Sequence, residues 1–129
     1  MKGLPEIYYR SSKFSTALIK FLRSFSVHPC YFSMINQITR SSTSISANII
    51  EAQNARSRKE FISSNTIALK EAEETRYWLG KIKDLNVVSS KRLNEFREEN
   101  HEIVKVISTI VSSAKKNLEE QNELLKQKT

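Results

Sequence analysis

The sequence predicts an all-α protein, an up-down-up-down antiparallel four-helix bundle, on three observations. Its 129 residues include only two glycines and two prolines, far fewer than the turns of a β-sandwich or an α/β fold require. Apolar residues recur at intervals of three and four along four segments, which is the spacing of one helix face. The connections between the segments are short, so neighbouring helices should run antiparallel. We expect one domain, residues 1–129.

The first helix is expected over residues 6–27. Its apolar stripe steps by four, three and four residues: Phe14, Leu18, Phe21 and Phe25. The opposite side carries basic residues: Lys13, Lys20 and Arg23. Proline at position 29 disfavours helix in the residue before it, and the helix should end there.

The second helix is expected over residues 31–53. Its stripe alternates steps of three and four: Ile35, Ile38, Ser42, Ile45, Ile49 and Ala52. The segment is rich in serine and threonine, which are mediocre helix formers. These small side chains should permit close approach of a neighbouring helix, with tertiary packing overriding propensity.

The third helix is expected over residues 58–84 and the fourth over residues 90–120. Ser57 and Glu60 fit a capping box at the start of the third helix. The stripe of the third helix is Phe61, Ala68, Ala72, Thr75, Leu79 and Ile82. That of the fourth is Leu93, Phe96, Asn100, Ile103, Ile107, Ile110 and Ala114. The tail, about residues 119–129, should either fray or extend as exposed helix.

Positive charge is concentrated in the first half of the chain. Residues 1–60 hold nine basic and three acidic side chains, whereas residues 61–129 hold twelve and eleven. A fixed basic region attracts polyanions, because neutralised phosphates release counterions. We therefore predict contact with RNA or DNA through six residues: Lys13, Lys20, Arg23, Arg56, Arg58 and Lys59. The alternative is a solvated basic surface without a ligand.

A second, polar stripe runs along the second helix at three- and four-residue intervals: Gln37, Arg40, Ser44, Asn48 and Glu51. A polar stripe of this kind is often plain solvent-facing surface. This one carries both charges, an amide and a hydroxyl, which can satisfy one another across a helix contact inside the bundle or between subunits. We assign structural or subunit contact to four of its members: Arg40, Ser44, Asn48 and Glu51.

Residues 37–52, QITRSSTSISANIIEA, resemble the signature of the four-helix-bundle proteins known as 23S ribosomal RNA intervening-sequence proteins. Residues 56–61 and 67–72 fall in register with later parts of that signature, and the resemblance covers residues 7–115. Residues 71–79 are closer to the subgroup related to the accessory variability protein of diversity-generating retroelements. The chain departs from the pattern at Ala52 and Asn54, where many members carry glycine. It also departs at Lys70 and Glu71, which replace a pair of small residues, glycine and serine, common in the family.

The resemblance implies a ring-like homopentamer. In the retroelement branch it also implies binding of nucleic acid and of a reverse transcriptase through a basic surface. The leading hypothesis is thus a non-catalytic helical oligomer that binds RNA or DNA with little sequence preference. The alternative is a protein-interaction scaffold, for a reverse transcriptase or another partner, that does not itself bind nucleic acid.

Other chemistry finds little support in the sequence. A di-iron bundle needs two Glu-x-x-His motifs, and this chain has one, from Glu98 to His101, so we expect no metal, no cofactor and no enzyme. A single cysteine, Cys30, and the lack of a signal peptide favour the cytoplasm. No apolar run reaches the roughly 18 residues that a membrane span requires. Tyr77 and Trp78 could stack on bases, although such aromatics more often close off a core or a subunit contact.

Overall fold

The computed structural model describes residues 3–128, and four α-helices make up nearly all of this part of the chain. A short 3₁₀ helix, η1, precedes the second of them. Within the described residues there is no strand, so the prediction of an all-α fold with four helices is confirmed. The elements are α1 (Glu6–Arg23), η1 (Pro29–Tyr31), α2 (Phe32–Gln53), α3 (Arg58–Asp84) and α4 (Ser90–Gln127).

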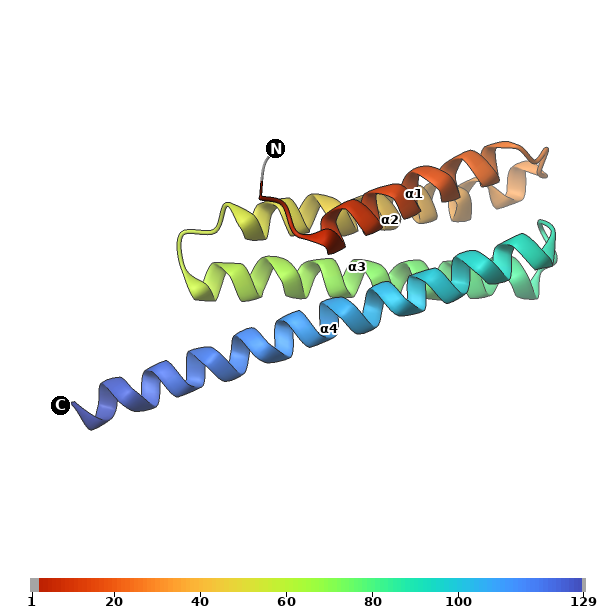
Figure 1. The fold of residues 1–129 in the computed structure, drawn as a ribbon. Helices are drawn as coiled ribbons and strands as arrows, with labels where there is room; N and C mark the ends of the chain where they lie inside the picture. The colour runs from red at the N-terminus through yellow and green to blue at the C-terminus, as the bar shows by residue number, and fades with distance from the viewer. Residues whose placement is uncertain (1–2, 129) are drawn as a thin grey trace.

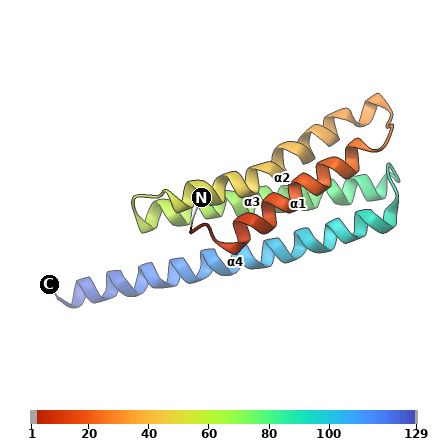
Figure 2. The ribbon, with the colours of Figure 1, turned by 45° about the horizontal axis from the view of Figure 1, so that its top comes forward.

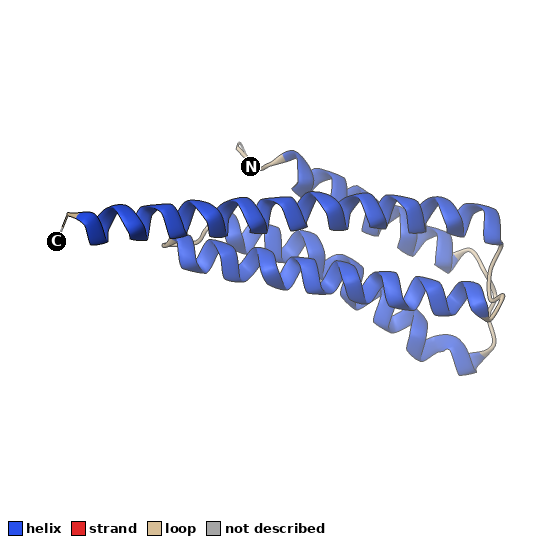
Figure 3. Cartoon of the chain, turned by 90° about the horizontal axis from the view of Figure 1, so that it is seen from below, coloured by secondary structure: helices blue, strands red, loops and turns tan. Residues whose placement is uncertain are grey.

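Successive helices reverse direction along the bundle (Figure 1). The contact between α2 and α3 is the most extensive, followed by those of α3 with α4 and of α1 with α2, while α1 meets α4 over a smaller area. Figure 2 shows α1, the shortest α-helix, spanning only part of the bundle. The C-terminal part of α4 continues past the ends of the other helices (Figure 3).

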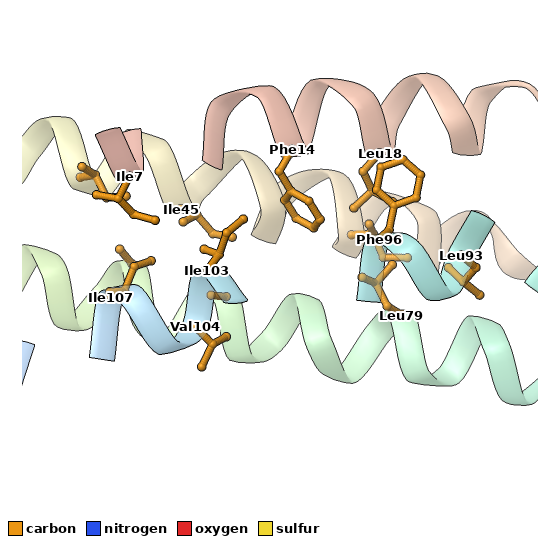
Figure 4. Close-up of a cluster of buried hydrophobic side chains, with 14 of the residues drawn as sticks. Ile7, Phe14, Leu18, Ile45, Leu79, Leu93, Phe96, Ile103, Val104 and Ile107 are labelled. Atoms are coloured by element: carbon orange, nitrogen blue, oxygen red, sulfur yellow. The ribbon is translucent and has the colours of Figure 1, made fainter. Parts of the chain in front are cut away.

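The predicted apolar stripes form the core (Figure 4). In α2 every member of the stripe is buried except Ile35, which is half-buried. In α3 and α4 the exceptions are Phe61 and Ile110, also half-buried. Leu18, Ile38, Ile45, Leu79, Leu93, Ile103 and Ile107 have no solvent exposure at all. Burying each such side chain is worth about 1.5–3 kcal/mol relative to leaving it in water.

Small and polar side chains line the contact between α2 and α3. The Thr75 hydroxyl donates to the Ser41 hydroxyl oxygen at 2.8 Å, and both residues are fully buried. Ala68 and Ala72, also fully buried, leave room on the α3 side. The serine-rich sequence of α2 thus serves close helix approach, as its composition suggests.

Two helix ends differ from the sequence-based expectation, and the first is that of α1. It ends at Arg23, four residues before the predicted position 27. The Ser24 hydroxyl donates to the Phe21 carbonyl at 2.6 Å, and the Ser24 amide donates to the same carbonyl at 3.1 Å. The Phe25 amide likewise donates to the Leu22 carbonyl at 3.3 Å, so a 3₁₀-type turn ends the helix before the constraint of Pro29 is reached.

The end of α4 is the second difference. The helix runs to Gln127, seven residues past the predicted position 120, so the tail is exposed helix rather than frayed chain. Leu118 is half-buried, while Leu124 and Leu125 are 58% and 63% exposed. Glu, Gln, Leu and Lys dominate this stretch and are good helix formers, so local propensity extends the helix without cover from other elements.

A Schellman motif ends α3. The Val87 amide donates to the Ile82 carbonyl at 3.3 Å and the Asn86 amide to the Lys83 carbonyl at 3.1 Å. Asn86 has a φ of 53°, in the left-handed region, where glycine and asparagine are the residues best tolerated.

Substitution of Asn86 tests how strongly this turn depends on its residue. Asn86→Ala should lower the free energy of unfolding by about 1 kcal/mol, because a Cβ without a compensating polar group is strained at positive φ. Asn86→Gly should be at least as stable as the wild type. Urea unfolding followed by circular dichroism measures both, and an alanine variant as stable as the glycine variant would contradict the assignment.

Candidate nucleic-acid interface

The six basic residues predicted to contact nucleic acid are all exposed in the structure. Of the nine basic residues in the first half, Lys2 lies outside the described residues. Arg10 and Arg40 form ion pairs with carboxylates of the second half. The remaining six form no ion pair with any part of the chain between residues 3 and 128: Lys13, Lys20, Arg23, Arg56, Arg58 and Lys59. Their positive charge is therefore available to an external anion.

Three of the six follow α1. Lys13 and Lys20 are seven residues apart, which is about two helical turns, and so share one face. They border a shallow depression of about 310 Å³ that also includes Thr16. Arg23 occupies the last position of the helix, where the carbonyl ends of the peptide dipoles favour a cation. We call Lys13, Lys20 and Arg23 the α1 cluster.

The other three lie at the turn between α2 and α3, and we call them the turn cluster: Arg56, Arg58 and Lys59. The predicted cap is confirmed in part, because the Ser57 hydroxyl oxygen accepts from the Glu60 amide at 3.1 Å. The Glu60 carboxylate accepts from the Arg56 amide at 2.9 Å, one residue earlier than in a standard capping box. The Arg58 guanidinium lies 5.8 Å from the centre of the Phe61 ring.

The two clusters lie toward opposite ends of the bundle rather than in one patch. All 22 residues of α2 run from the end of the α1 cluster to the turn cluster, a length of about 33 Å. Figure 1 shows the α2–α3 turn at one end and the α1–α2 connection at the other. A single duplex that touched both clusters of one chain would have to span about ten base pairs at ~3.4 Å each.

Arg40, from the polar stripe of α2, ties this helix to α3. Its guanidinium contacts the Glu71 carboxylate at 3.0 Å and also pairs with Glu74. Its Nε donates to the Gln37 side chain at 3.1 Å. The hydrogen bond from Arg40, with a second from the Trp78 indole, holds the pKa of the Glu74 carboxyl below its usual range. Arg40 thus links α2 to α3 inside the bundle.

The other members of the polar stripe act within their own helix. The Ser44 hydroxyl donates to the Arg40 carbonyl and the Asn48 amide to the Ser44 carbonyl, each at 2.7 Å. Glu51 is exposed and borders a small depression together with Glu60 and Asn54. A role for these residues in subunit contact stays a prediction.

The structure adds two features that the sequence analysis did not identify. Arg10 of α1 forms a two-point ion pair with Glu99 of α4, at 2.9 and 2.7 Å, across the smaller helix contact. A groove of about 540 Å³ also lies between α3 and α4, lined partly by Arg76, Lys83 and Arg97. The seven-residue spacing of Arg76 and Lys83 is visible in the sequence, but only packing shows that Arg97 joins them.

Between residues 3 and 128 no three His, Cys, Asp or Glu side chains gather in a way that could hold a metal ion. Cys30 is exposed and reduced. In the same range no helix combines the length and the apolar character that a membrane crossing requires.

The Arg40–Glu74 pair predicts a pH-dependent stability. Because the folded state lowers the Glu74 pKa, the pair stabilises the fold above the pKa of the unfolded carboxyl and loses this effect as pH falls through the folded value. Both side chains are more than a third exposed, so solvent limits the contribution to at most about 1 kcal/mol. Arg40→Gln should therefore destabilise the protein at pH 7 and much less near pH 3, as measured by urea unfolding at both pH values. An equal effect at the two values would contradict a Coulombic role.

Comparisons with known proteins agree with this architecture. The family described as 23S rRNA-intervening sequence protein matches residues 5–109. Among solved structures, a protein of unknown function from the S23 ribosomal protein family of Bacteroides thetaiotaomicron is 37% identical, with a TM-score of 0.72. The match covers 81% of this chain and 97% of that one. No curated protein matches the chain. The match over most of the chain, in sequence and in fold, shows that it belongs to the 23S rRNA-intervening sequence protein family.

Proposed function

We propose that this protein is a non-catalytic, cytoplasmic helical oligomer that binds RNA or DNA through its basic surface with little sequence preference. The observation that supports the proposal is the set of six exposed basic residues that have no carboxylate partner among residues 3–128, in the α1 cluster and the turn cluster. Arg10 and Arg40, the other described basic residues of the first half, are already neutralised by ion pairs. Within the described part of the first half, the unpaired positive charge therefore lies in these two clusters.

The turn cluster is the better placed of the two for phosphate contact. Arg56, Arg58 and Lys59 surround the first turn of α3, where the peptide dipoles add partial positive charge. Arginine presents a planar fork of donors that matches the oxygens of a phosphate. Contacts of this kind involve the backbone of the nucleic acid, so they favour tight binding at low salt and weak base preference.

The name of the matched family makes ribosomal RNA a reasonable first ligand. It refers to an intervening sequence of 23S rRNA, and the phosphate backbone of an RNA is a ligand that exposed cations can contact. Structured RNA and duplex DNA should both bind, because phosphate contacts do not distinguish base edges.

Neutralising part of the turn cluster should weaken this binding. The double variant Arg56→Gln with Lys59→Gln should bind structured RNA at least tenfold less tightly at 100 mM salt. Its plot of log affinity against log salt should also flatten by about two units, one for each lost phosphate contact. Fluorescence anisotropy with labelled RNA and duplex DNA measures both quantities.

The matched control removes two cations that are already engaged in ion pairs on α4. Lys105 lies 3.2 Å from Glu102 and Lys126 lies 3.8 Å from Glu123. Lys105→Gln with Lys126→Gln changes the net charge equally and should shift affinity by less than threefold. Negligible affinity of the wild type for both ligands at 50 mM salt would contradict the proposal.

The scaffold alternative leads to a different result. If the bundle serves to capture a protein such as a reverse transcriptase, charge reversal at Arg56, Arg58 and Lys59 should leave partner capture intact. Loss of nucleic-acid binding together with retained partner capture would indicate that both functions exist on separate surfaces.

We further propose that the chain assembles into a ring-like homopentamer, as the resemblance implies. Two large apolar side chains are exposed in the single chain and are available for subunit contacts: Phe32 and Ile67. A closed ring would also repeat each basic cluster around its circumference, so that one RNA could contact clusters of several chains.

Light scattering at micromolar concentration tests the assembly. The expected mass is five times the 14.9 kDa of one chain. A mass equal to that of a single chain would exclude the ring, whereas another multiple would retain self-association and change the subunit count.

A further inference from the structure

We propose that the groove between α3 and α4 is a second binding site, which takes a nucleoside phosphate with an unpaired base. The source of this ligand is either a nucleotide within a single strand or a free nucleotide. The proposal deepens the nucleic-acid function and, for the single-strand source, rests on it. It uses none of the six residues of the α1 and turn clusters.

Three cations from two helices meet at this groove. Arg76 and Lys83 extend from α3 and Arg97 from α4. Within residues 3–128, Lys83 and Arg97 form no ion pair, and Arg76 has only a long contact of 3.7 Å with Glu73 of its own helix. Two guanidinium groups and an ammonium group that converge in this way suit the oxygens of a phosphate.

The groove also offers hydrogen-bond acceptors, which a bare phosphate would not use. The Asn94 side-chain oxygen is buried and has no donor among the described residues. Glu98 and Glu102 also line the groove, and Glu102 is held by Lys105 at 3.2 Å. A buried acceptor without a partner is unfavourable, and a ligand hydroxyl or amino group would remove this cost. The ligand should therefore carry an anion together with donor groups, as a nucleoside phosphate does.

Gly80 gives independent support. It lies inside α3, and glycine is the least favourable residue in a helix interior apart from proline. A Cβ at Gly80 would meet only the Arg97 Nη2 atom, at 4.0 Å, so no internal contact requires the missing side chain. An adjoining depression of about 430 Å³ contains Gly80, Arg76 and Arg97. The glycine thus leaves this depression, which shares Arg76 and Arg97 with the groove, open to a close ligand.

Tyr77 provides a surface on which the base can stack, beside Gly80. Its side chain is 55% exposed and borders the same depression as Gly80. Lys81 lies 5.9 Å from the centre of the Tyr77 ring, which adds a cation beside the stacking surface. Stacking on an aromatic ring requires a base outside a duplex, which is why we specify an unpaired base.

The fluorescence of Trp78, the only tryptophan of the chain, can report binding at this site. Its ring meets the Tyr77 ring edge to face, with centres 5.0 Å apart. A base that stacks on Tyr77 should change the Trp78 fluorescence, so titration with adenosine 5′-monophosphate, a ten-nucleotide oligoadenylate RNA and inorganic phosphate reports binding at this site.

The key variant is Gly80→Leu, because it separates folding from binding. Leucine is a better helix former than glycine and its Cβ has open space, so the melting temperature should rise by about 4 °C. The same side chain fills the depression beside Gly80, so it should weaken the binding of both adenosine monophosphate and the oligonucleotide at least tenfold. Arg97→Gln should weaken both similarly, whereas Lys116→Gln, its charge-matched control on an exposed part of α4 outside the groove, should have less than a threefold effect.

The outcomes distinguish this proposal from the nucleic-acid function. Unchanged affinity for both nucleotide ligands in Gly80→Leu and Arg97→Gln would overturn the groove site, even if the turn-cluster variant still lost RNA binding. Binding of inorganic phosphate as tight as that of the nucleotide would overturn recognition of the base. Binding of the free nucleotide without binding of any strand would support the groove site and identify a free nucleotide as the source, while the proposed function would fail.

Discussion

The packing of α2 against α3 is the contact on which the rest of the structure depends. It is the most extensive helix pair in the bundle, and the small side chains of Ser41 and Thr75 meet within it. The Thr75 and Ser41 hydroxyls contact each other at 2.8 Å, and each also contacts a carbonyl of its own helix, so these buried polar groups are satisfied. With these two helices fixed, α1 and α4 only need to present their apolar stripes to the resulting core.

This contact also determines which charges remain available. Arg40 lies on α2 opposite Glu71 and Glu74 of α3, so close packing brings the three together and neutralises the arginine. Arg10 is neutralised by Glu99 in the same way across α1 and α4. Basic residues along the helix contacts therefore stabilise the bundle, and those on the outer face of α1 and at the α2–α3 turn are left for a ligand.

Patterns local to one helix could be predicted from the sequence, and patterns between helices could not. The stripe of α2 and the Ser57 cap depend on residues a few positions apart, and the structure confirms both. The early end of α1 is a 3₁₀-type turn at Ser24 and Phe25, which the spacing of apolar residues does not distinguish from a further helical turn. The separation of the α1 cluster from the turn cluster depends on the length and direction of α2, so counting the charged residues in the sequence does not predict it. The groove between α3 and α4 is the clearest case, because only packing brings Arg97 of α4 beside Arg76 and Lys83 of α3.

Gly80 is an exception to the rule that good helix formers occupy the interior of a helix. A sequence that specifies one structure uses good helix formers inside helices, and exceptions concentrate at functional or strained positions. Gly80 has no strain to relieve, since its Cβ space is open and its φ is not in the left-handed region. Asn86, by contrast, has a positive φ that the Schellman motif itself requires, so its unusual conformation is explained by the turn. The turn accounts for Asn86. The space beside Gly80, near Arg97 and Tyr77, is open, so the ligand proposed for this site is the explanation for the glycine.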